Sequence, residues 1–238
     1  MSKLDLSLKG FAIGIRFRPN FSIEDQLGCI VDKILYTKKS FFGPEFFPLV
    51  RNLVGKKILI NEKTKNRMTI NNVDLTLEIG YDFDDSIISS FYSKVLRHFE
   101  AEIIKGVLGA FGVQDIIRIG LVKNYTCVSK PLSKSFVKKT VGDMVDVGAI
   151  DLSFSKKILL NESLRRRGVN DYDNVIFKIS VDSKPDDIHF VVDYQRYFSP
   201  NLSSSSDIEF KDFSSAADRY NDNNFIKWLS DNYFGDVS

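Results

Sequence analysis

The sequence predicts an α+β fold of two ferredoxin-like (split β-α-β) halves, with antiparallel sheets and helices on one face. Two observations support this prediction. The first half shows the element order strand, helix, strand, strand, helix, strand, which is the ferredoxin-like order. A seven-residue segment then recurs at a distance of 100 residues, followed by another alternating strand. We therefore expect one half at residues 1–128 and a second at 129–238.

The chain is expected to begin with a strand and a helix. Residues 11–17 are mostly apolar and stop before a proline, which predicts a strand. Ser22 is the expected N-cap of a helix whose apolar residues recur at helical spacing up to Leu35. Cys29 in this helix and Cys127 at a strand end are both interpreted as small core residues.

A segment rich in Phe and Pro follows at residues 40–55, and its two prolines argue against regular structure there. Whether Phe41–Phe47 belongs to the core or forms an exposed docking patch stays open. Strands are expected at 57–62 and 69–80, because apolar and polar residues alternate in the second of them.

The strongest helical pattern follows Asp84 and Asp85 and ends at Gly109 and Gly112, with apolar residues every three or four positions. Residues 116–122 should form the next strand. In the second half a short helix is expected at 130–139. Further strands are predicted at 150–160, 174–182 and 187–195, and a final helix at about 213–230.

The repeated segment reads KKILINE at 56–62 and KKILLNE at 156–162, which are identical at six of seven positions. Two explanations remain open. One is chance similarity in a chain rich in Lys, Ile, Leu and Asn. The other is an internal duplication, in which the hairpins at 56–80 and 156–182 take equivalent places.

Positive charge gathers around these two copies, although the net charge is only +2. Phosphate binding needs several cations near one another, and arginine in particular makes bidentate phosphate contacts. The alternative is a solvated hairpin tip that charge keeps soluble. The candidate nucleic-acid-binding residues are Lys56, Lys57, Lys63, Lys65, Arg67, Lys156, Lys157, Arg165, Arg166 and Arg167.

No motif for catalysis, a metal or a cofactor is recognisable. The two histidines have no second ligand at suitable spacing, so neither a zinc site nor any cofactor is expected. Three carboxylates, Asp82, Asp84 and Asp85, precede the long helix. They are typical of a helix start, and the alternative is a metal-dependent nuclease site that would need further residues from elsewhere.

Three patches resemble an uncharacterised, sporadically distributed family of bacterial proteins of about 240 residues. They are the segments 118–124 and 191–197 and the C-terminal helix at 216–229. A histidine expected near Asn221 in that family is missing here. The resemblance implies no activity and no site residues, but the patchy distribution would suit a mobile element or phage defence.

The predicted duplication also resembles the CRISPR RNA-processing endoribonucleases. Those enzymes carry a Gly-rich loop near the C-terminus, whereas this chain has only Gly235 after Gly168. We therefore expect a non-enzymatic protein that binds nucleic acid or a partner protein, with a nuclease as the alternative. Neither a signal peptide nor a membrane span is expected, so the predicted compartment is the cytoplasm.

Overall fold

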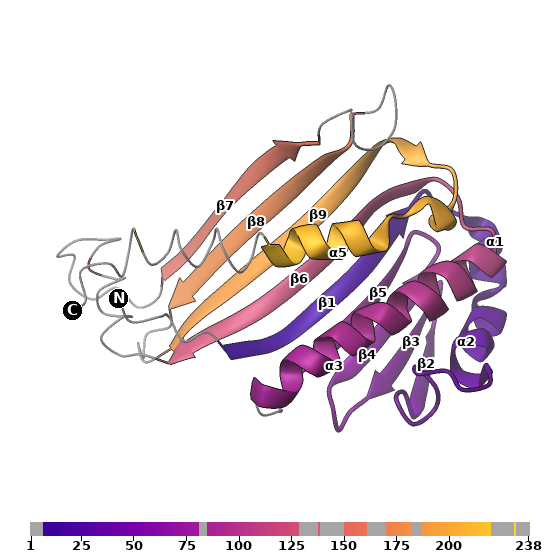
Figure 1. The fold of residues 1–238 in the computed structure, drawn as a ribbon. Helices are drawn as coiled ribbons and strands as arrows, with labels where there is room; N and C mark the ends of the chain where they lie inside the picture. Colours follow the sequence, from indigo (N-terminus) through magenta and orange to yellow (C-terminus); the bar gives the residue numbers. More distant parts are fainter. Residues whose placement is uncertain are drawn as a thin grey trace.

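A computed structural model of the protein describes residues 7–80, 85–128, 138, 150–160, 170–181, 187–219 and 231. The described residues form one nine-stranded sheet in the order β2-β3-β4-β5-β1-β6-β9-β8-β7 (Figure 1). The strands are β1 (Ser7–Phe17), β2 (Leu49–Leu53), β3 (Lys56–Asn61), β4 (Asn66–Asn71), β5 (Asp74–Gly80), β6 (Ile116–Val128), β7 (Ile150–Leu159), β8 (Tyr172–Val181) and β9 (Asp187–Leu202).

The prediction of two ferredoxin-like halves is wrong. Two such halves would form two four-stranded sheets, whereas the described strands form one nine-stranded antiparallel sheet. Four strands, β2 to β5, also follow one another between α2 and α3, where the ferredoxin-like order has two. The two central strands, β1 and β6, also pair with each other, so one sheet runs through both predicted halves.

Two local features explain the error. The segment expected to be irregular contains β2, which pairs with β3 along its full length. The strand expected at 69–80 is divided into β4 and β5 by a turn. The side chain of Asn71 accepts hydrogen bonds from the backbone N–H groups of Val73 and Asp74, both at 2.8 Å. An asparagine in this role reverses the chain.

The strand order is mirrored about the border between β1 and β6. Strands β5, β4 and β3 follow β1 on one side, and β9, β8 and β7 follow β6 on the other. The repeated segments begin in β3 and β7 and therefore hold corresponding places. By place, β4 corresponds to β8 and β5 to β9, so the expected match of 69–80 with a single later strand is incorrect.

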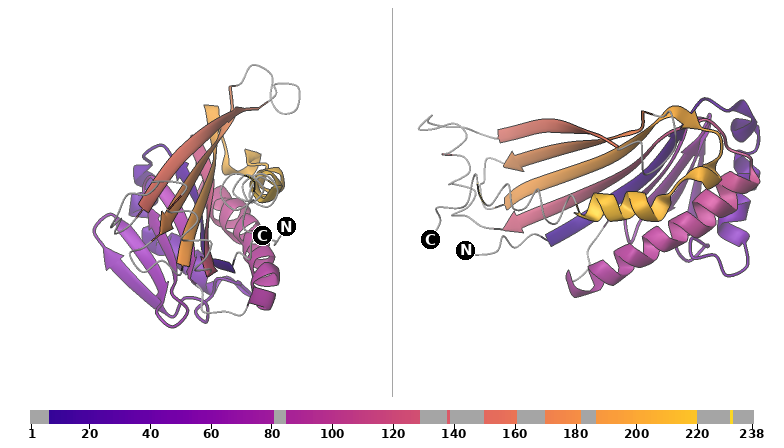
Figure 2. Two further views of the ribbon diagram at one scale, coloured as in Figure 1. Left: turned by 90° about the vertical axis from the view of Figure 1, so that its left-hand side faces the viewer. Right: turned by 45° about the horizontal axis from the view of Figure 1, so that its top comes forward.

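Helices lie over one face of the sheet (Figure 2). Helix α3 (Asp85–His98) continues into the π-helix η1 (Phe99–Leu108), and α5 (Phe210–Arg219) follows the short 3₁₀ helix η3 (Ser205–Asp207). Between β1 and β2, α1 (Phe21–Asp25) leads to α2 (Leu27–Tyr36), which packs against η1 and β3. Asn20, rather than Ser22, caps α1, because its side chain accepts from the Ser22 backbone N–H at 3.1 Å.

The core lies between the helices and the face of the sheet that they cover. Along β1, β5, β8 and β9, buried residues alternate with half-buried or exposed ones, as expected for a sheet covered on one side. The segment 41–47 belongs to this core, because Phe42 and Phe47 are fully buried. Cys127 is buried as predicted, but Cys29 is exposed, so its predicted core position is wrong.

Several predicted features fall outside the described residues: Asp82, Asp84, the Arg165–Arg167 loop, the helix at 130–139 except for Lys138, and the end of the last helix beyond Arg219. Asp85 begins α3, but its side chain is not described. Among the helices that the structure describes, none is both long and apolar enough to cross a membrane.

Candidate functional site

The face of the sheet opposite α3 and α5 carries a groove of about 180 Å³ over its central strands. Gly14 on β1 and Gly120 on β6 lie directly opposite each other and form its floor. A Cβ atom at Gly14 would stand 3.1 Å from the Thr76 hydroxyl, whereas one at Gly120 would make only ordinary contacts. Two adjacent glycines in central strands thus open a space where side chains would otherwise stand.

Arg16 and Arg118 stand side by side at one end of the groove. They are direct cross-strand partners on β1 and β6, and both line the groove. Like charges directly opposite each other in a sheet are unfavourable. Among the described residues, the exposed Arg16 side chain makes no ion pair or hydrogen bond, although Asp74 faces it across the strand pair from β5. An anion between the two guanidinium groups would remove their repulsion.

A chain of hydrogen bonds along β9 holds Arg118 in place. Arg118 Nη1 donates to Gln195 Oε1 at 2.9 Å and to the Tyr197 hydroxyl at 3.0 Å. The Tyr197 hydroxyl donates to Gln195 Oε1 at 2.7 Å, and Gln195 Nε2 donates to Asp193 Oδ2 at 2.6 Å. The guanidinium therefore has a defined position before any ligand arrives.

Asp193 is the carboxylate at the far end of this chain, and it also lines the groove. Burial raises the pKa of its carboxyl above the usual 3.8, although the Gln195 hydrogen bond and the charges of Arg118 and Lys178 lower it. A partly buried carboxylate beside the groove opposes anion binding while it is ionised.

An aromatic stack extends the site toward the edge of the sheet. The rings of Tyr197 and Tyr172 are cross-strand partners, with centroids 4.9 Å apart and planes 7° apart. Lys157 Nζ lies 3.9 Å from the centre of the Tyr172 ring, and the Arg118 guanidinium lies 5.7 Å from that of Tyr197. The stack therefore runs from β7 to β6 with a cation at each end.

Of the predicted binding residues, the structure brings Lys56, Arg67 and Lys157 to the groove side of the sheet. Lys56 is the cross-strand partner of Asn71, so the two side chains share a face of the sheet. The side chain of Asn71 donates a hydrogen bond to Asp74, and Asp74 is in turn the cross-strand partner of Arg16. Arg67 stands opposite Glu78 on the same face.

Two of the other predicted cations that the structure describes lie on the covered face. Lys57 and Lys156 alternate with their neighbours and face the other side. Lys63 and Lys65 lie in the turn between β3 and β4, and Arg165, Arg166 and Arg167 lie outside the described residues. Since β3 and β7 are near opposite edges of the sheet, the described lysines of the two predicted clusters do not form one patch.

Sequence reasoning missed Arg16, Arg118, Tyr172 and Tyr197 because it searched for runs of cations. A usable signal was present: each central strand has an arginine two residues from a glycine, in IGIR at 13–16 and in RIGL at 118–121. In a strand, residues two apart share a face. Only the pairing of β1 with β6 shows that the two motifs meet.

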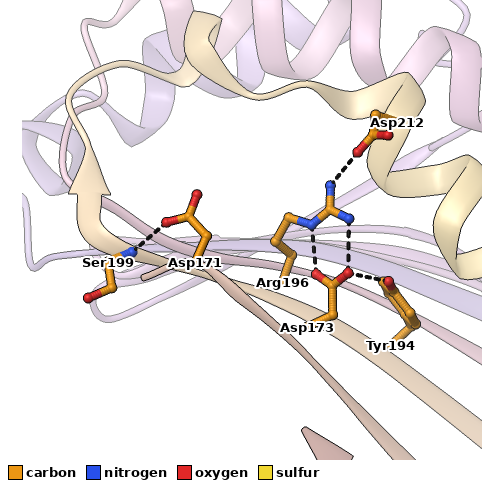
Figure 3. Close-up of polar contacts among 6 residues, drawn as sticks. All are labelled: Asp171, Asp173, Tyr194, Arg196, Ser199 and Asp212. Atoms are coloured by element: carbon orange, nitrogen blue, oxygen red, sulfur yellow. Dashed lines mark hydrogen bonds and ion pairs between the residues drawn. The ribbon is translucent and has the colours of Figure 1, made fainter. Parts of the chain in front are cut away.

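A buried ion-pair network fixes the sheet beneath α5 (Figure 3). The Arg196 guanidinium on β9 contacts Asp173 on β8 through Nε at 2.7 Å and Nη2 at 3.0 Å, and Asp212 on α5 through Nη1 at 2.8 Å. The Tyr194 hydroxyl donates to Asp173 as well. Arg196 and Asp173 are each only 2% exposed.

The groups in this network shift one another's pKa values. Burial alone would lower the pKa of Arg196, but the hydrogen bonds and charge of Asp173 outweigh it and raise the pKa. Burial and the Asp173 contact both raise the pKa of Tyr194. This network lies on the covered face and is a structural support for β8 and β9, the strands that carry the aromatic stack.

A second contact ties β6 to both covering helices. Lys123 Nζ lies 2.5 Å from Asp218 Oδ1 on α5 and 4.6 Å from the centre of the Tyr92 ring on α3. The Tyr92 hydroxyl donates to the same Asp218 oxygen at 2.8 Å. Within the described part of the chain, no group of three or more His, Cys, Asp or Glu residues is arranged to hold a metal ion.

Comparison with protein-family models finds no match for this chain, and comparison with curated proteins finds none either. The resemblance to an uncharacterised bacterial family therefore stays a prediction. Two of its three patches, 118–124 and 191–197, are paired along β6 and β9 and supply Arg118, Asp193 and Tyr197 to the groove region.

Proposed function

We propose that the protein is a non-enzymatic binding protein whose open sheet face binds nucleic acid. The observation that carries this proposal is the facing pair Arg16 and Arg118 above the glycine floor. Guanidinium groups bind phosphate through paired hydrogen bonds. The absence of side chains at Gly14 and Gly120 lets a phosphate approach both guanidinium groups from the groove.

The cations that flank the pair favour a polymer over a single small anion. Lys56 on β3 and Lys157 on β7 lie on the same face, toward the two ends of the sheet. Seven strand spacings separate these two strands, which corresponds to about 34 Å at about 4.8 Å per spacing. Several phosphates along a chain could contact cations placed over such a length.

The first test is direct binding of labelled RNA and DNA, single-stranded and duplex, with and without Mg²⁺. We expect retention without cleavage, and affinity that falls as salt rises because phosphate contacts release counterions. Cleavage in either condition would favour the nuclease alternative. Failure to bind every nucleic acid at low salt would overturn the proposal and favour a protein partner.

Arginine and lysine variants test the face that binds. Arg16→Ala and Arg118→Ala should each weaken binding and reduce the slope of log affinity against log salt by about 0.7–0.9. The effect should be similar for all sequences, since phosphate contacts carry no base information.

A matched pair on β3 serves as the control. Lys56→Ala should weaken binding, whereas Lys57→Ala, one residue away on the other side of the sheet, should not. If Lys56→Ala and Lys57→Ala weaken binding equally, binding depends only on overall charge, and the proposal that the open face binds nucleic acid is refuted.

Asp193→Asn should strengthen nucleic-acid binding, because it removes a negative charge from the groove. In the wild type, affinity should rise as pH falls toward the raised pKa of Asp193, since protonation neutralises the carboxylate. The variant should lack this part of the rise. Fluorescence anisotropy from pH 7 down to about pH 5 would measure both effects, and identical pH profiles would contradict the assigned role.

A further inference from the structure

Strand β7 is an edge of the sheet, and it is exposed over most of its ten residues. Five consecutive side chains, from Ser153 to Lys157, are exposed, and Leu159 is 75% exposed. No strand among the described residues pairs with its outer side. An edge strand of this length offers a row of backbone N–H and C=O groups to another strand.

We propose that a second copy of this chain pairs antiparallel with β7 about a two-fold axis at Phe154. Apart from Leu152, which faces Lys156 of the second copy, the residues of the strand are complementary to those of the second copy in this register. Asp151 faces Lys157 of the second copy, and Ile150 faces Ile158 of the second copy. Ser153 likewise faces Ser155 of the second copy, and the two copies of Phe154 face each other.

The faces of the sheet restrict the choice of register. A two-fold axis through the sheet keeps the open faces of both copies on one side, and facing residues of an antiparallel pair share a face. The axis must therefore pass through a residue, and that residue faces the same residue of the second copy. With Ser153 at the axis, Asp151 would face Ser155, and with Ser155 at the axis it would face Leu159.

Only the register centred on Phe154 pairs Asp151 with Lys157. Because of the two-fold symmetry, the dimer contains this pair twice. Opposite charges facing each other across a strand pair are favourable, and aromatic pairs are favourable as well. The other edge of the sheet lacks this complementarity. In β2 the central residue, Arg51, would face its own copy or an exposed leucine.

A dimer is also favoured over an open chain of subunits. Pairing of β7 with β2 of another copy would leave two free edges and would continue as a filament. Pairing of β7 with itself closes after two copies. The interface is a single strand pair, which is smaller than a standard interface, so we expect a concentration-dependent dimer. This inference needs no ligand on the open face, although it engages Lys157, whose Nζ lies 3.9 Å from the centre of the Tyr172 ring on that face.

Charge exchange tests the proposal. Asp151→Lys and Lys157→Asp should each weaken dimerisation by about tenfold or more, because each places like charges opposite one another twice. The double variant restores two opposite-charge pairs and should restore the dimer. Lys178→Asp is a matched control, since Lys178 is exposed on the same face but lies one strand inward on β8. Sedimentation velocity over a concentration series gives the dissociation constants.

Cross-linking tests the register. In a Cys29→Ser background, Phe154→Cys should form a disulfide dimer, because facing Cα atoms in an antiparallel pair are about 4.5–5.5 Å apart. Ser153→Cys should not, since its own copy is displaced along the strand beyond the reach of a disulfide. A monomer at all concentrations, association that continues into filaments, or failure of the double variant to recover the dimer would overturn the proposal.

Discussion

Arg196→Met is expected to lower the free energy of unfolding by about 3–5 kcal/mol, the cost of removing one partner of a buried ion pair. Arg196 neutralises Asp173, which is 2% exposed, and also contacts Asp212 on α5. Methionine fills similar space but leaves the Asp173 carboxylate without its cation. The loss is a large part of the 5–15 kcal/mol that stabilises a typical domain.

Chemical denaturation followed by circular dichroism would measure this loss. Arg51→Ala is the control, because Arg51 pairs with Glu62 at 2.7 Å but both side chains are more than 60% exposed. Its cost should stay within about 1 kcal/mol. The double variant Asp173→Leu/Arg196→Met should lose less free energy of unfolding than the sum of the two single variants. In the double variant neither position carries a buried charge that lacks its partner. Equal costs for Arg196→Met and Arg51→Ala would contradict the structural role of the network.

Several elements could be predicted because their residues follow one period without interruption. The alternating residues of β8 and β9 indicate strands buried on one face, and the apolar rhythm of α3 and η1 indicates a long helix. The prediction failed where one polar side chain decides the path of the backbone. The strand expected at 69–80 is divided at Asn71, whose side chain accepts hydrogen bonds from the backbone N–H groups of Val73 and Asp74. With β2 added and with β4 and β5 as separate strands, the described part of the first half has six strands in place of the four in the ferredoxin-like order.

The candidate site could be predicted only in part, for a related reason. Alternation shows that Lys56 and Lys57 face opposite sides of a strand, but not which side is covered by helices. Cations that are adjacent in the sequence therefore appeared to form clusters. The pair Arg16 and Arg118 is 102 residues apart in the sequence and meets only through the register of β1 with β6. Such pairing depends on the whole sheet, and a local pattern does not contain it.

Gly120→Leu is expected to abolish the proposed nucleic-acid binding while the fold stays intact. A Cβ atom at Gly120 would meet its nearest neighbours, in Gln195 and Tyr194, at 3.7 and 3.9 Å, which are ordinary contacts. The leucine side chain would then stand in the groove between Arg16, Arg118 and Asp193. Glycine also weakens a strand interior, so the midpoint of unfolding should stay the same or rise.

Gly10→Ala is the control, because it should lower stability but leave the groove unchanged. Its Cβ atom would lie 2.8 Å from the backbone oxygen of Ile79 on β5, which forces β1 and β5 apart. Gly10 does not line the groove, so this variant should lose stability without a direct loss of phosphate contacts. Binding measured well below the unfolding midpoint should therefore be weaker for Gly120→Leu than for Gly10→Ala, although the order of their stabilities is reversed. If Gly120→Leu binds as tightly as the wild type, the groove is not the place where the ligand enters, and the role of Arg16 and Arg118 is refuted with it.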